Sequence, residues 1–502
     1  MRRYLSPFVA LALVLSACGG ASSPTPTITQ DGTLEPYYKQ TVTWTSCEEN
    51  LECAKVLVPL DYEKPNGGDI TLSVARHQAS KQTKTVIFLN PGGPGGSGID
   101  YLKYWSEQFS KTLSNSADLV SWDPRGVKRS APVDCISDAQ MDADIKLDPT
   151  PDTPAELTVF WKSLDDEYPM CLEKTGDVLS HVSTVESARD LDVLRAVLGQ
   201  ETLNYLGKSY GTQLGAVYAK LFPTKVGNFV LDGAVDQSLS TKQASLDQAV
   251  AFDVAIRRMA QYCLSTNSVC PIGRSESQII SKIQAFLNSL DQKPLKTDNP
   301  DRPLYESQGW NALLMPMYVS NGGWDWLIQA LEAAYKGNGS ELLAISDWAM
   351  NRNPNGTYDD NSNEAFIAIS CLDYGRTTNR DIESIIPEFE KAAPITGRAL
   401  AWGESACVDW PAQGILMPTD VSVQVAKPIM VIGTTYDPAT PLKWGKALAK
   451  QLGDAVFVQF NGDGHTAYYS GSNCIDKIVD DFFLNGTEPA ANTICQPDTP
   501  LL

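Results

Sequence analysis

A serine flanked by two glycines is the first feature of this sequence that could do chemistry. Residues 204–223 read NYLGKSYGTQLGAVYAKLFP, in which Gly207, Ser209 and Gly211 form a G-x-S-x-G pattern between an apolar run and a helical segment. In this pattern a strand turns sharply into a helix, and the serine hydroxyl is exposed at the tip of the turn. Such a strained position indicates a function, so Ser209 is the predicted nucleophile.

A serine nucleophile needs a base, and the whole chain has only 3 histidines. His465 lies in the glycine-rich segment NGDGHTAYY after an apolar run, and loops of this kind often carry functional residues. His77, in LSVARHQAS, is expected to be a surface or packing residue, and His181 is expected to have a local polar role. His465 is therefore the predicted general base.

The acid that would orient this base is expected at the end of another strand. Asp437 follows the apolar run IMVIG, and the order Ser209, Asp437, His465 is that of the α/β-hydrolase triad. In this arrangement His465 takes the serine proton, while Asp437 fixes the tautomer of the imidazole and stabilises its cation. Asp463 is the alternative acid, but it is poorly placed to reach the far nitrogen of a ring two residues away. A turn-forming role before Pro438 is the alternative for Asp437.

Backbone donors for an oxyanion are predicted in the segment LNPGGPGGSG, residues 89–98. Its glycines follow an apolar run directly, as in an oxyanion loop, and the N–H groups of Gly93 and Tyr210 are the natural pair. A phosphate-binding loop is the alternative for so many glycines. It lacks the Gly-Lys-Ser/Thr ending and the third glycine of G-x-G-x-x-G, which disfavours that alternative.

The elements that must position these residues alternate between apolar runs and helical patterns, which is typical of a mostly parallel sheet wrapped by helices. We expect strands at 85–90, 118–123, 202–207, 228–233, 429–433 and 455–460, and a helix at 183–199. Between about 240 and 425 helical patterns dominate. The fold class predicted is therefore α/β: an α/β-hydrolase fold with a large, mainly helical cap inserted before the last strands. The core would comprise residues 36–240 and 426–502, and the cap residues 241–425.

Charge and composition limit the partners. The formal net charge of −20 argues against nucleic-acid binding, which needs a basic surface. The sequence contains no C-x-x-C pair and no histidine-rich cluster, so zinc is not expected. We expect no metal, no cofactor and a monomer that acts on a peptide or protein substrate.

The N-terminus is typical of an exported lipoprotein. Two arginines precede a short apolar stretch and the tetrapeptide LSAC, which resembles the bacterial lipobox. Residues 1–17 would be the signal peptide, Cys18 the lipidated residue, and residues 18–35 a flexible tether rich in Ser, Thr, Pro and Gly. We expect the protein to be anchored to the cell membrane on the extracytoplasmic face, and we expect some of the molecules to be released. An ordinary signal peptide with a chance cysteine is the alternative.

The cysteines agree with export. The chain has 11 cysteines, and assigning Cys18 to lipid leaves an even number, as expected for disulfides in an oxidising compartment. Cysteines that neighbour each other in sequence are expected to pair: 47–53, 135–171, 263–270, 371–407 and 474–495.

Several segments together resemble a known family. LNPGGPGGSG, SWDPRGVKRS, the segment around Ser209, VLDGAVD and GTTYDPATP…GDGHT resemble the secreted tripeptidyl aminopeptidases and proline-iminopeptidase-like serine peptidases of actinobacteria. This family includes lipoprotein members with a TAP-like C-terminal region, and the resemblance spans about residues 40–480. It implies the same triad and oxyanion loop, although NPGGPGG here departs from the HGGPGG form. It also implies a structural role for Asp123 and Arg125 in SWDPRG.

The resemblance further implies a helical cap whose acidic residues capture the free amino terminus of a substrate. Asp373 and Glu404, which lie close in sequence to Cys371 and Cys407, are candidates, and a solvated or helix-capping acid is the alternative for Asp373. The expected function is a serine exopeptidase of tripeptidyl, dipeptidyl or prolyl aminopeptidase type. A carboxylesterase, a lipase or an endopeptidase with the same triad is the alternative, and a non-catalytic binding protein is a third hypothesis.

Overall fold

The computed structural model describes residues 32–48, 50–106, 108–109, 111–266, 269–453, 455–500 and 502. The predicted signal peptide, the predicted lipidation site Cys18 and most of the predicted tether lie outside these residues. Within the described chain, no helix combines the length and the apolar character needed to cross a membrane.

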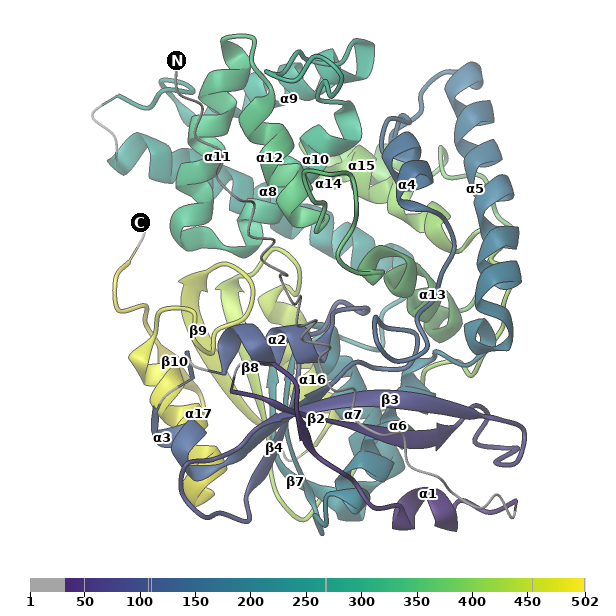
Figure 1. Cartoon of the computed structure of the whole chain (residues 1–502). Coiled ribbons are helices and arrows are strands. Elements are labelled where there is room, and N and C mark those ends of the chain that lie inside the picture. The colour runs from purple at the N-terminus through teal and green to yellow at the C-terminus, as the bar shows by residue number, and fades with distance from the viewer. Residues whose placement is uncertain are drawn as a thin grey trace, which may run out of the picture.

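One 10-stranded sheet organises the described residues, with the strand order β1-β2-β3-β5-β4-β6-β7-β8-β9-β10 (Figure 1). The strands are β1 (Thr45–Ser46), β2 (Glu52–Pro59), β3 (Asp69–His77), β4 (Val86–Asn90), β5 (Asp118–Trp122), β6 (Leu203–Lys208), β7 (Val226–Asp232), β8 (Ile429–Tyr436), β9 (Val456–Asp463) and β10 (Thr493–Cys495). Strands β1, β2, β3 and β5 pair antiparallel, and from β5 to β10 all pairs are parallel. The predicted strands are confirmed, with shifts of a few residues at their ends.

Helices cover both faces of this sheet. They are α1 (Glu35–Lys39), α2 (Gly98–Trp105), α3 (Lys111–Ser116), α6 (Thr184–Val197), α7 (Tyr210–Leu221), α16 (Leu442–Gln451) and α17 (Asn473–Asn485), with short 3-10 turns η1 (Gly176–Ser180) and η2 (Pro223–Lys225). Phe88 of β4 packs in one apolar cluster with residues of α6 and α7, whereas its neighbour Ile87 packs in another with residues of α2, α3 and α17. A strand buried on both faces must be apolar at every position, which explains the continuous apolar run of β4.

The remaining helices form a layer over one end of the sheet. They are α4 (Asp138–Asp144), α5 (Pro154–Thr175), α8 (Thr241–Thr266), α9 (Glu276–Gln292), α10 (Glu306–Tyr318), α11 (Ser320–Tyr335), α12 (Ser340–Ala349), α13 (Ser362–Tyr374), α14 (Ile386–Ala392), α15 (Gly397–Trp402) and the 3-10 turn η3 (Gly403–Cys407). All except α4 and α5 lie between β7 and β8 in the chain. Helices α8 to α12 share an apolar cluster of their own. The α/β-hydrolase fold with a helical cap is thus the architecture of the chain.

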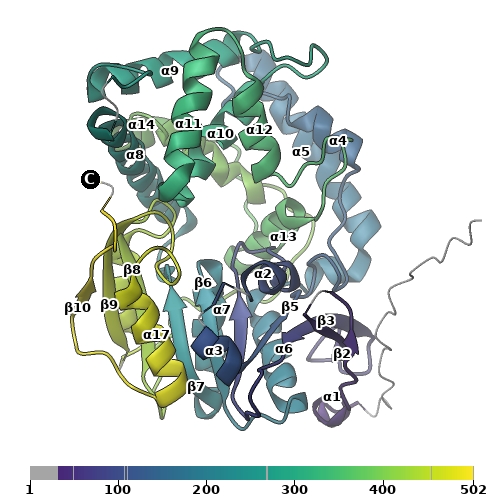
Figure 2. The same cartoon turned by 60° about the vertical axis from the view of Figure 1, so that its left-hand side comes forward.

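Helices α4 and α5 lie beside the cap helices in both views, although they precede the nucleophile in sequence (Figures 1 and 2). Phe160 and Trp161 of α5 pack against Trp402 of α15 in a cluster that also contains Phe389 of α14. The helices that pack together in this layer are therefore not contiguous in the chain. We propose that the functional cap comprises α4 and α5 as well as residues 241–425.

Five disulfides form among the described residues, and each joins the sequence neighbours that were predicted to pair: Cys47–Cys53, Cys135–Cys171, Cys263–Cys270, Cys371–Cys407 and Cys474–Cys495.

Candidate active site

Ser209 occupies a strained turn between β6 and α7. Its backbone has φ 56° and ψ −126°, a conformation that residues other than glycine rarely adopt. A Cβ added at Gly207 would lie 2.3 Å from the carbonyl oxygen of Gly211, and one at Gly211 would lie 2.8 Å from Oδ1 of Asn90. Both glycines of the pattern are therefore required by close contacts, and they leave the serine at the tip of the turn.

His465 and Asp437 lie in contact after the ends of β9 and β8. The imidazole Nδ1 of His465 is 2.9 Å and 3.0 Å from the two carboxylate oxygens of Asp437. Asp437 is buried and also accepts hydrogen bonds from the backbone N–H of Ala439 and of Thr440, at 2.9 Å and 2.8 Å. The Thr440 hydroxyl donates to the same carboxylate at 2.9 Å. These bonds orient Asp437 toward the ring, as the predicted roles require.

The end of β7 brings Ser209 and His465 to the same place. The backbone N–H of Ser209 donates to the carbonyl of Asp232 at 2.9 Å. A Cβ added at the next residue, Gly233, would lie 3.3 Å from Cε1 of His465. His465 Nε2 is buried and makes no hydrogen bond within the described chain, to Ser209 or to any other residue. Such bonds between nucleophile and base often form only once substrate is bound.

Two buried charged residues, which sequence reasoning missed, hold the loop after His465. Asp232 accepts hydrogen bonds from the backbone N–H of Ala467 and of Tyr468, both at 2.9 Å. Lys208, the neighbour of the nucleophile, donates to the carbonyl of Tyr468 at 2.7 Å. Burial raises the pKa of Asp232 and lowers the pKa of Lys208. Their positions at the ends of β7 and β6 were the only sequence signal that could have found them.

The glycine-rich loop after β4 is pressed against the nucleophile. A Cβ added at Gly92 would lie 2.9 Å from Cβ of Ser209 and 3.1 Å from the backbone nitrogen of Tyr210. Gly93 and Tyr210, the two predicted oxyanion donors, line the same cavity as Ser209. Backbone can approach the serine this closely only where side chains are missing, which explains why the loop is rich in glycine.

This cavity has a volume of about 590 Å³ and is walled by both the core and the cap. Glu404 of η3 and Asp373 of α13 line it together with Ser209, so the two predicted amine-binding acids share one cavity with the nucleophile. Glu404 is half-buried, and its carboxylate accepts hydrogen bonds from the hydroxyls of Thr241 and Ser245 at 2.8 Å and 2.7 Å. These neutral donors leave its negative charge without a paired cation among the described residues.

Asp373, unlike Glu404, has both carboxylate oxygens bonded to the N-terminus of a helix. Its two carboxylate oxygens accept hydrogen bonds from the backbone N–H and the hydroxyl of Thr184, at 2.8 Å and 2.6 Å, at the N-terminus of α6. Burial raises the pKa of Asp373 to about 7. The helix-capping interpretation therefore has direct geometric support, although the residue also lines the cavity.

Cap residues also contact the loop that carries His465. The backbone N–H of His465 donates to the carbonyl of Tyr318 at 3.0 Å, and the two rings meet edge to face at 5.2 Å. Asp463, the alternative acid, forms an ion pair with Arg258 of α8. Helix α8 and the end of α10 are therefore part of the support of the predicted base.

The other candidates have structural roles. Arg125 is fully buried and donates to Asp190 through Nε and Nη2, both at 2.7 Å, while Asp123 accepts a hydrogen bond from the Ser97 hydroxyl. His181 Nδ1 is 2.8 Å from Glu186. His77 is the last residue of β3, on the antiparallel side of the sheet.

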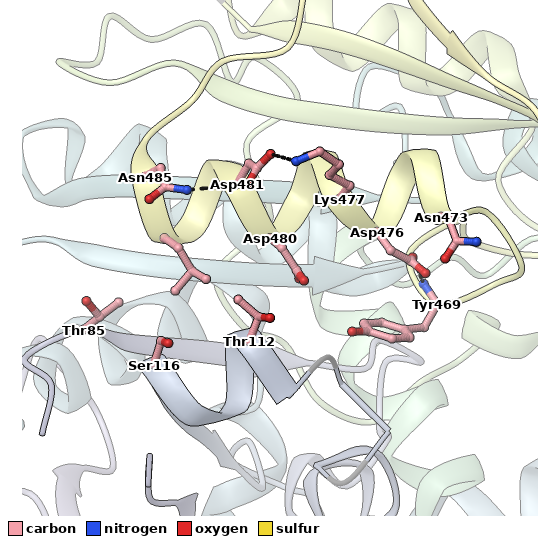
Figure 3. Close-up of a pocket in the computed structure, with 11 residues that line it drawn as sticks. Thr85, Thr112, Ser116, Tyr469, Asn473, Asp476, Lys477, Asp480, Asp481 and Asn485 are labelled. Carbon is pink, nitrogen blue, oxygen red and sulfur yellow. Dashed lines mark hydrogen bonds and ion pairs between the residues drawn. The ribbon is translucent and has the colours of Figure 1, made fainter. Parts of the chain in front are cut away.

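A second cavity, of about 770 Å³, lies between α17 and α3 (Figure 3). None of the predicted catalytic residues lines it. Its acidic residues are Asp476, Asp480 and Asp481, and Lys477 pairs with Asp481 at 2.7 Å within the same helix. Its size alone gives no reason to place chemistry there.

Known proteins resemble this chain over nearly its whole length. A family described as TAP-like protein matches residues 393–495. Serine protease Hip1 of Mycobacterium tuberculosis is 34% identical over 515 residues, which cover 97% of this chain and 96% of Hip1. Carboxylesterase B of the same organism is 34% identical over 476 residues, 90% of each chain. Tripeptidyl aminopeptidase of Streptomyces lividans is 30% identical over 490 residues, 91% of this chain and 87% of that enzyme.

Each of these three relatives aligns with 90% or more of this chain, and the predicted resemblance is thereby confirmed. By sequence, this chain belongs to the family of serine protease Hip1 and tripeptidyl aminopeptidase, and its C-terminal part, residues 393–495, matches the TAP-like model.

Proposed function

We propose that this protein is a serine exopeptidase that cleaves peptide bonds near free N-termini, with Ser209, His465 and Asp437 as its catalytic triad. The observation that carries the proposal is the cavity of about 590 Å³ in which the strained serine and two cap carboxylates lie together. A carboxylate near the nucleophile attracts a protonated amino terminus, and its distance from Ser209 would limit how many residues precede the cleaved bond.

The chemistry follows from the geometry. The Ser209 hydroxyl attacks the carbonyl carbon of the peptide, and His465 Nε2 takes its proton. Asp437, held by Thr440 and by backbone N–H groups, stabilises the imidazolium that results. The N–H groups of Gly93 and Tyr210 would stabilise the oxyanion. His465 then protonates the leaving amine. In the second half, His465 takes a proton from a water molecule that attacks the acyl-enzyme carbonyl, and it returns that proton to Ser209 Oγ as the acid product leaves.

Glu404 is the better candidate for binding the amino terminus. Its carboxylate is half-buried and contacts only hydroxyl groups among the described residues, whereas both oxygens of Asp373 are bonded to Thr184. A substrate ammonium group could therefore pair with Glu404 without breaking a structural contact. In our proposal Asp373 shapes the cavity wall and adds negative charge.

Carboxylester hydrolysis is the second candidate function. It is favoured by the name of one relative, carboxylesterase B, which is as similar in identity as Hip1. The triad and the oxyanion donors act on esters and peptides alike, so only the cap distinguishes the two.

We further propose that the protein is exported. Five disulfides support this, since disulfides persist in oxidising compartments outside the cytoplasm. A lipid anchor on Cys18 and a monomeric state complete the proposal. Mass spectrometry of the membrane-extracted N-terminal peptide tests the anchor: an acylated Cys18 supports it, and an unmodified peptide with another N-terminus contradicts it.

A labelling and turnover experiment tests the activity. A fluorophosphonate probe should label the wild type and should not label Ser209→Ala, whose turnover should fall at least about 10⁴-fold. The substrates are free-amine tripeptide anilides, their N-acetylated forms and short-chain aryl esters. Turnover of free-amine peptides alone supports the exopeptidase. Ester turnover without a preference for free amines would assign the carboxylesterase function, and a lack of labelling would support a non-catalytic protein.

A matched pair of cap variants tests the amine site. Glu404→Gln should raise KM for free-amine peptides about 10- to 100-fold, because a charged hydrogen bond is lost, and should leave KM for N-acetylated peptides unchanged. Glu388→Gln is the control, since Glu388 pairs with Lys242 on the same cap but does not line the cavity. Equal effects of the two variants, or of Glu404→Gln on both substrates, would contradict the amine site.

A further inference from the structure

Acidic residues gather where three segments of the cap meet, on a part of the molecule that the catalytic proposal does not use. One carboxylate oxygen from each of Asp148, Glu156 and Asp291 lies within 4.8 Å of the others. Asp148 belongs to the connection between α4 and α5, Glu156 to the first turn of α5, and Asp291 to the last turn of α9. Helices α4 and α5 lie alongside the other cap helices (Figure 2).

A fourth carboxylate is buried beside this cluster with an oxygen that no hydrogen bond satisfies. Glu306, the first residue of α10, is only 7% exposed. Its Oε1 accepts hydrogen bonds from Trp310 Nε1 and the Thr150 hydroxyl, both at 2.9 Å. Its Oε2 is buried and has no partner within the described chain, and the same holds for Oδ2 of Asp148. An unsatisfied buried carboxylate oxygen is costly, so these atoms indicate a missing ligand.

The two carboxyl groups face each other. The carboxyl group of Glu306 is in hydrogen-bonding contact with that of Asp148. The unpartnered oxygens of Glu306 and Asp148 therefore belong to one site and not to two separate defects.

Within the described residues, no basic side chain forms an ion pair with these four carboxylates. None of the ion pairs of the described residues includes Asp148, Glu156, Asp291 or Glu306. A fifth acid, Asp152, lies close enough to Asp291 and Glu156 to interact with their charges. Arg398 is the cation that acts on Asp152, and it pairs with Glu390 at 2.9 Å. Like charges brought together without a counter-charge destabilise a fold, which a bound cation would reverse.

We propose that Asp148, Glu156, Asp291 and Glu306 form a Ca²⁺ site that joins the α4–α5 connection to helices α9 and α10. All the ligands are hard carboxylate oxygens, without histidine or cysteine, which suits Ca²⁺ and disfavours Zn²⁺. Ca²⁺ takes 6–8 oxygens in flexible geometry, so water would complete the shell, whereas Mg²⁺ demands stricter octahedral positions.

Without the ion, each of the four carboxylates still accepts a hydrogen bond from the protein. Glu156 Oε2 accepts from the backbone N–H of Asp152 and of Thr153 as part of a capping box. Asp291 Oδ2 accepts from Gln292, and Asp148 Oδ1 accepts from the N–H of Thr150. Each side chain is thus held with one oxygen used by the protein, which preorganises the other for a ligand.

A proton shared between Asp148 and Glu306 is the competing explanation of their unpartnered oxygens. It would satisfy both atoms at low pH, but it leaves Glu156 and Asp291 unneutralised. The two explanations differ in what they predict for added Ca²⁺, and neither depends on the peptidase assignment.

Thermal unfolding of the full chain, freed of metal with a chelator, tests the proposal. Titration with Ca²⁺ up to ~10 mM should raise Tm by a few degrees at pH 7.5, since a ligand that binds only the folded state stabilises it. Asp291→Asn and Asp148→Asn should fold normally, because each removes a repulsive charge, and should lose most of this rise. Glu332→Gln, which changes an acid paired with Lys336 on α11, is the control and should keep the full rise.

Tb³⁺ luminescence gives a second readout. Trp310 donates to Glu306 and would sensitise Tb³⁺ bound there, so excitation of tryptophan should produce emission that Ca²⁺ displaces and that Trp310→Phe reduces. Two outcomes would overturn the site. An unchanged Tm and no sensitised emission would leave the shared proton as the explanation. An equal Ca²⁺ response in the wild type and in both Asn variants would place the cation elsewhere.

Discussion

Arg258 of the cap holds Asp463, which lies two residues before the predicted base His465. Its Nη2 donates to Oδ2 of Asp463 at 2.8 Å, its Nε contacts Oδ1, and its guanidinium lies 3.6 Å from the centre of the Tyr436 ring. Tyr436 itself directly precedes Asp437. One arginine of the cap therefore contacts the segments next to both the predicted acid and the predicted base, so the cap supports these segments as well as covering the cavity.

Removing this contact should affect turnover more than binding. Arg258→Met should lower kcat about 10- to 100-fold with a smaller change in KM, because small displacements of a general base are costly. Steady-state kinetics on a free-amine peptide anilide measure it. Arg257→Gln is the control, since Arg257, the neighbour of Arg258 on α8, pairs with Glu276 inside the cap. A pure KM effect in Arg258→Met would show that the arginine serves substrate binding instead.

Thr440 should prove a positioning residue for the acid. Its hydroxyl donates to Asp437 at 2.9 Å and lies 3.3 Å from His465 Nδ1. Thr440→Val keeps the shape but leaves an oxygen of Asp437 without this donor, and we expect kcat to fall about tenfold. Thr440→Ser should restore most of the rate. A valine variant with normal kcat and an unchanged pH profile would exclude this role.

Asp373 should make stability depend on pH. Its pKa is raised by burial to about 7 in the folded protein, whereas an unfolded Asp titrates near 4. The folded state therefore holds a proton that the unfolded chain has lost. Binding of this proton stabilises the folded protein fully below about pH 4. The stabilisation, up to about 4 kcal/mol, is lost as pH rises to about 7.

Denaturant unfolding at several pH values measures this contribution. As pH rises from about 4 to 7, the unfolding free energy of the wild type should fall relative to that of Asp373→Asn. Glu404→Gln serves as control, because its carboxylate is half-buried and bonded to hydroxyls. A difference that is independent of pH would mean that Asp373 is ionised in the folded protein throughout.

The disulfide Cys371–Cys407 should link stability to substrate binding. It joins α13, which carries Asp373, to η3, which carries Glu404, across 36 residues. Replacing both cysteines by serine should cost about 3–4 kcal/mol of unfolding free energy and raise KM for free-amine peptides. Replacing Cys47 and Cys53, which are remote from the cavity, should leave KM unchanged. Equal KM values for both double variants would separate this disulfide from the substrate site.

Local patterns explain most of what could be predicted. The strand at 203–208, the turn at Ser209 and the helix after it follow from residues adjacent in sequence, and so do the five disulfides, because neighbouring cysteines close short loops. The pairing of Asp437 with His465 was also predictable, since parallel strands end at one edge of a sheet. The α4 and α5 helices were assigned to the core by chain order, because nothing in their sequence indicates which layer they pack against.

The sequence by itself determined the turn at Ser209, the strands and the cysteine pairs, and it predicted the triad, because each depends on residue types and short spacings. Only the tertiary structure decided that Arg258 supports the loop of His465, that both oxygens of Asp373 are bonded to Thr184, and that Asp148, Glu156, Asp291 and Glu306 converge. These contacts join residues up to about 200 positions apart. Periodicity and composition carry no information about such partners, since packing of whole helices, and not local propensity, brings them together.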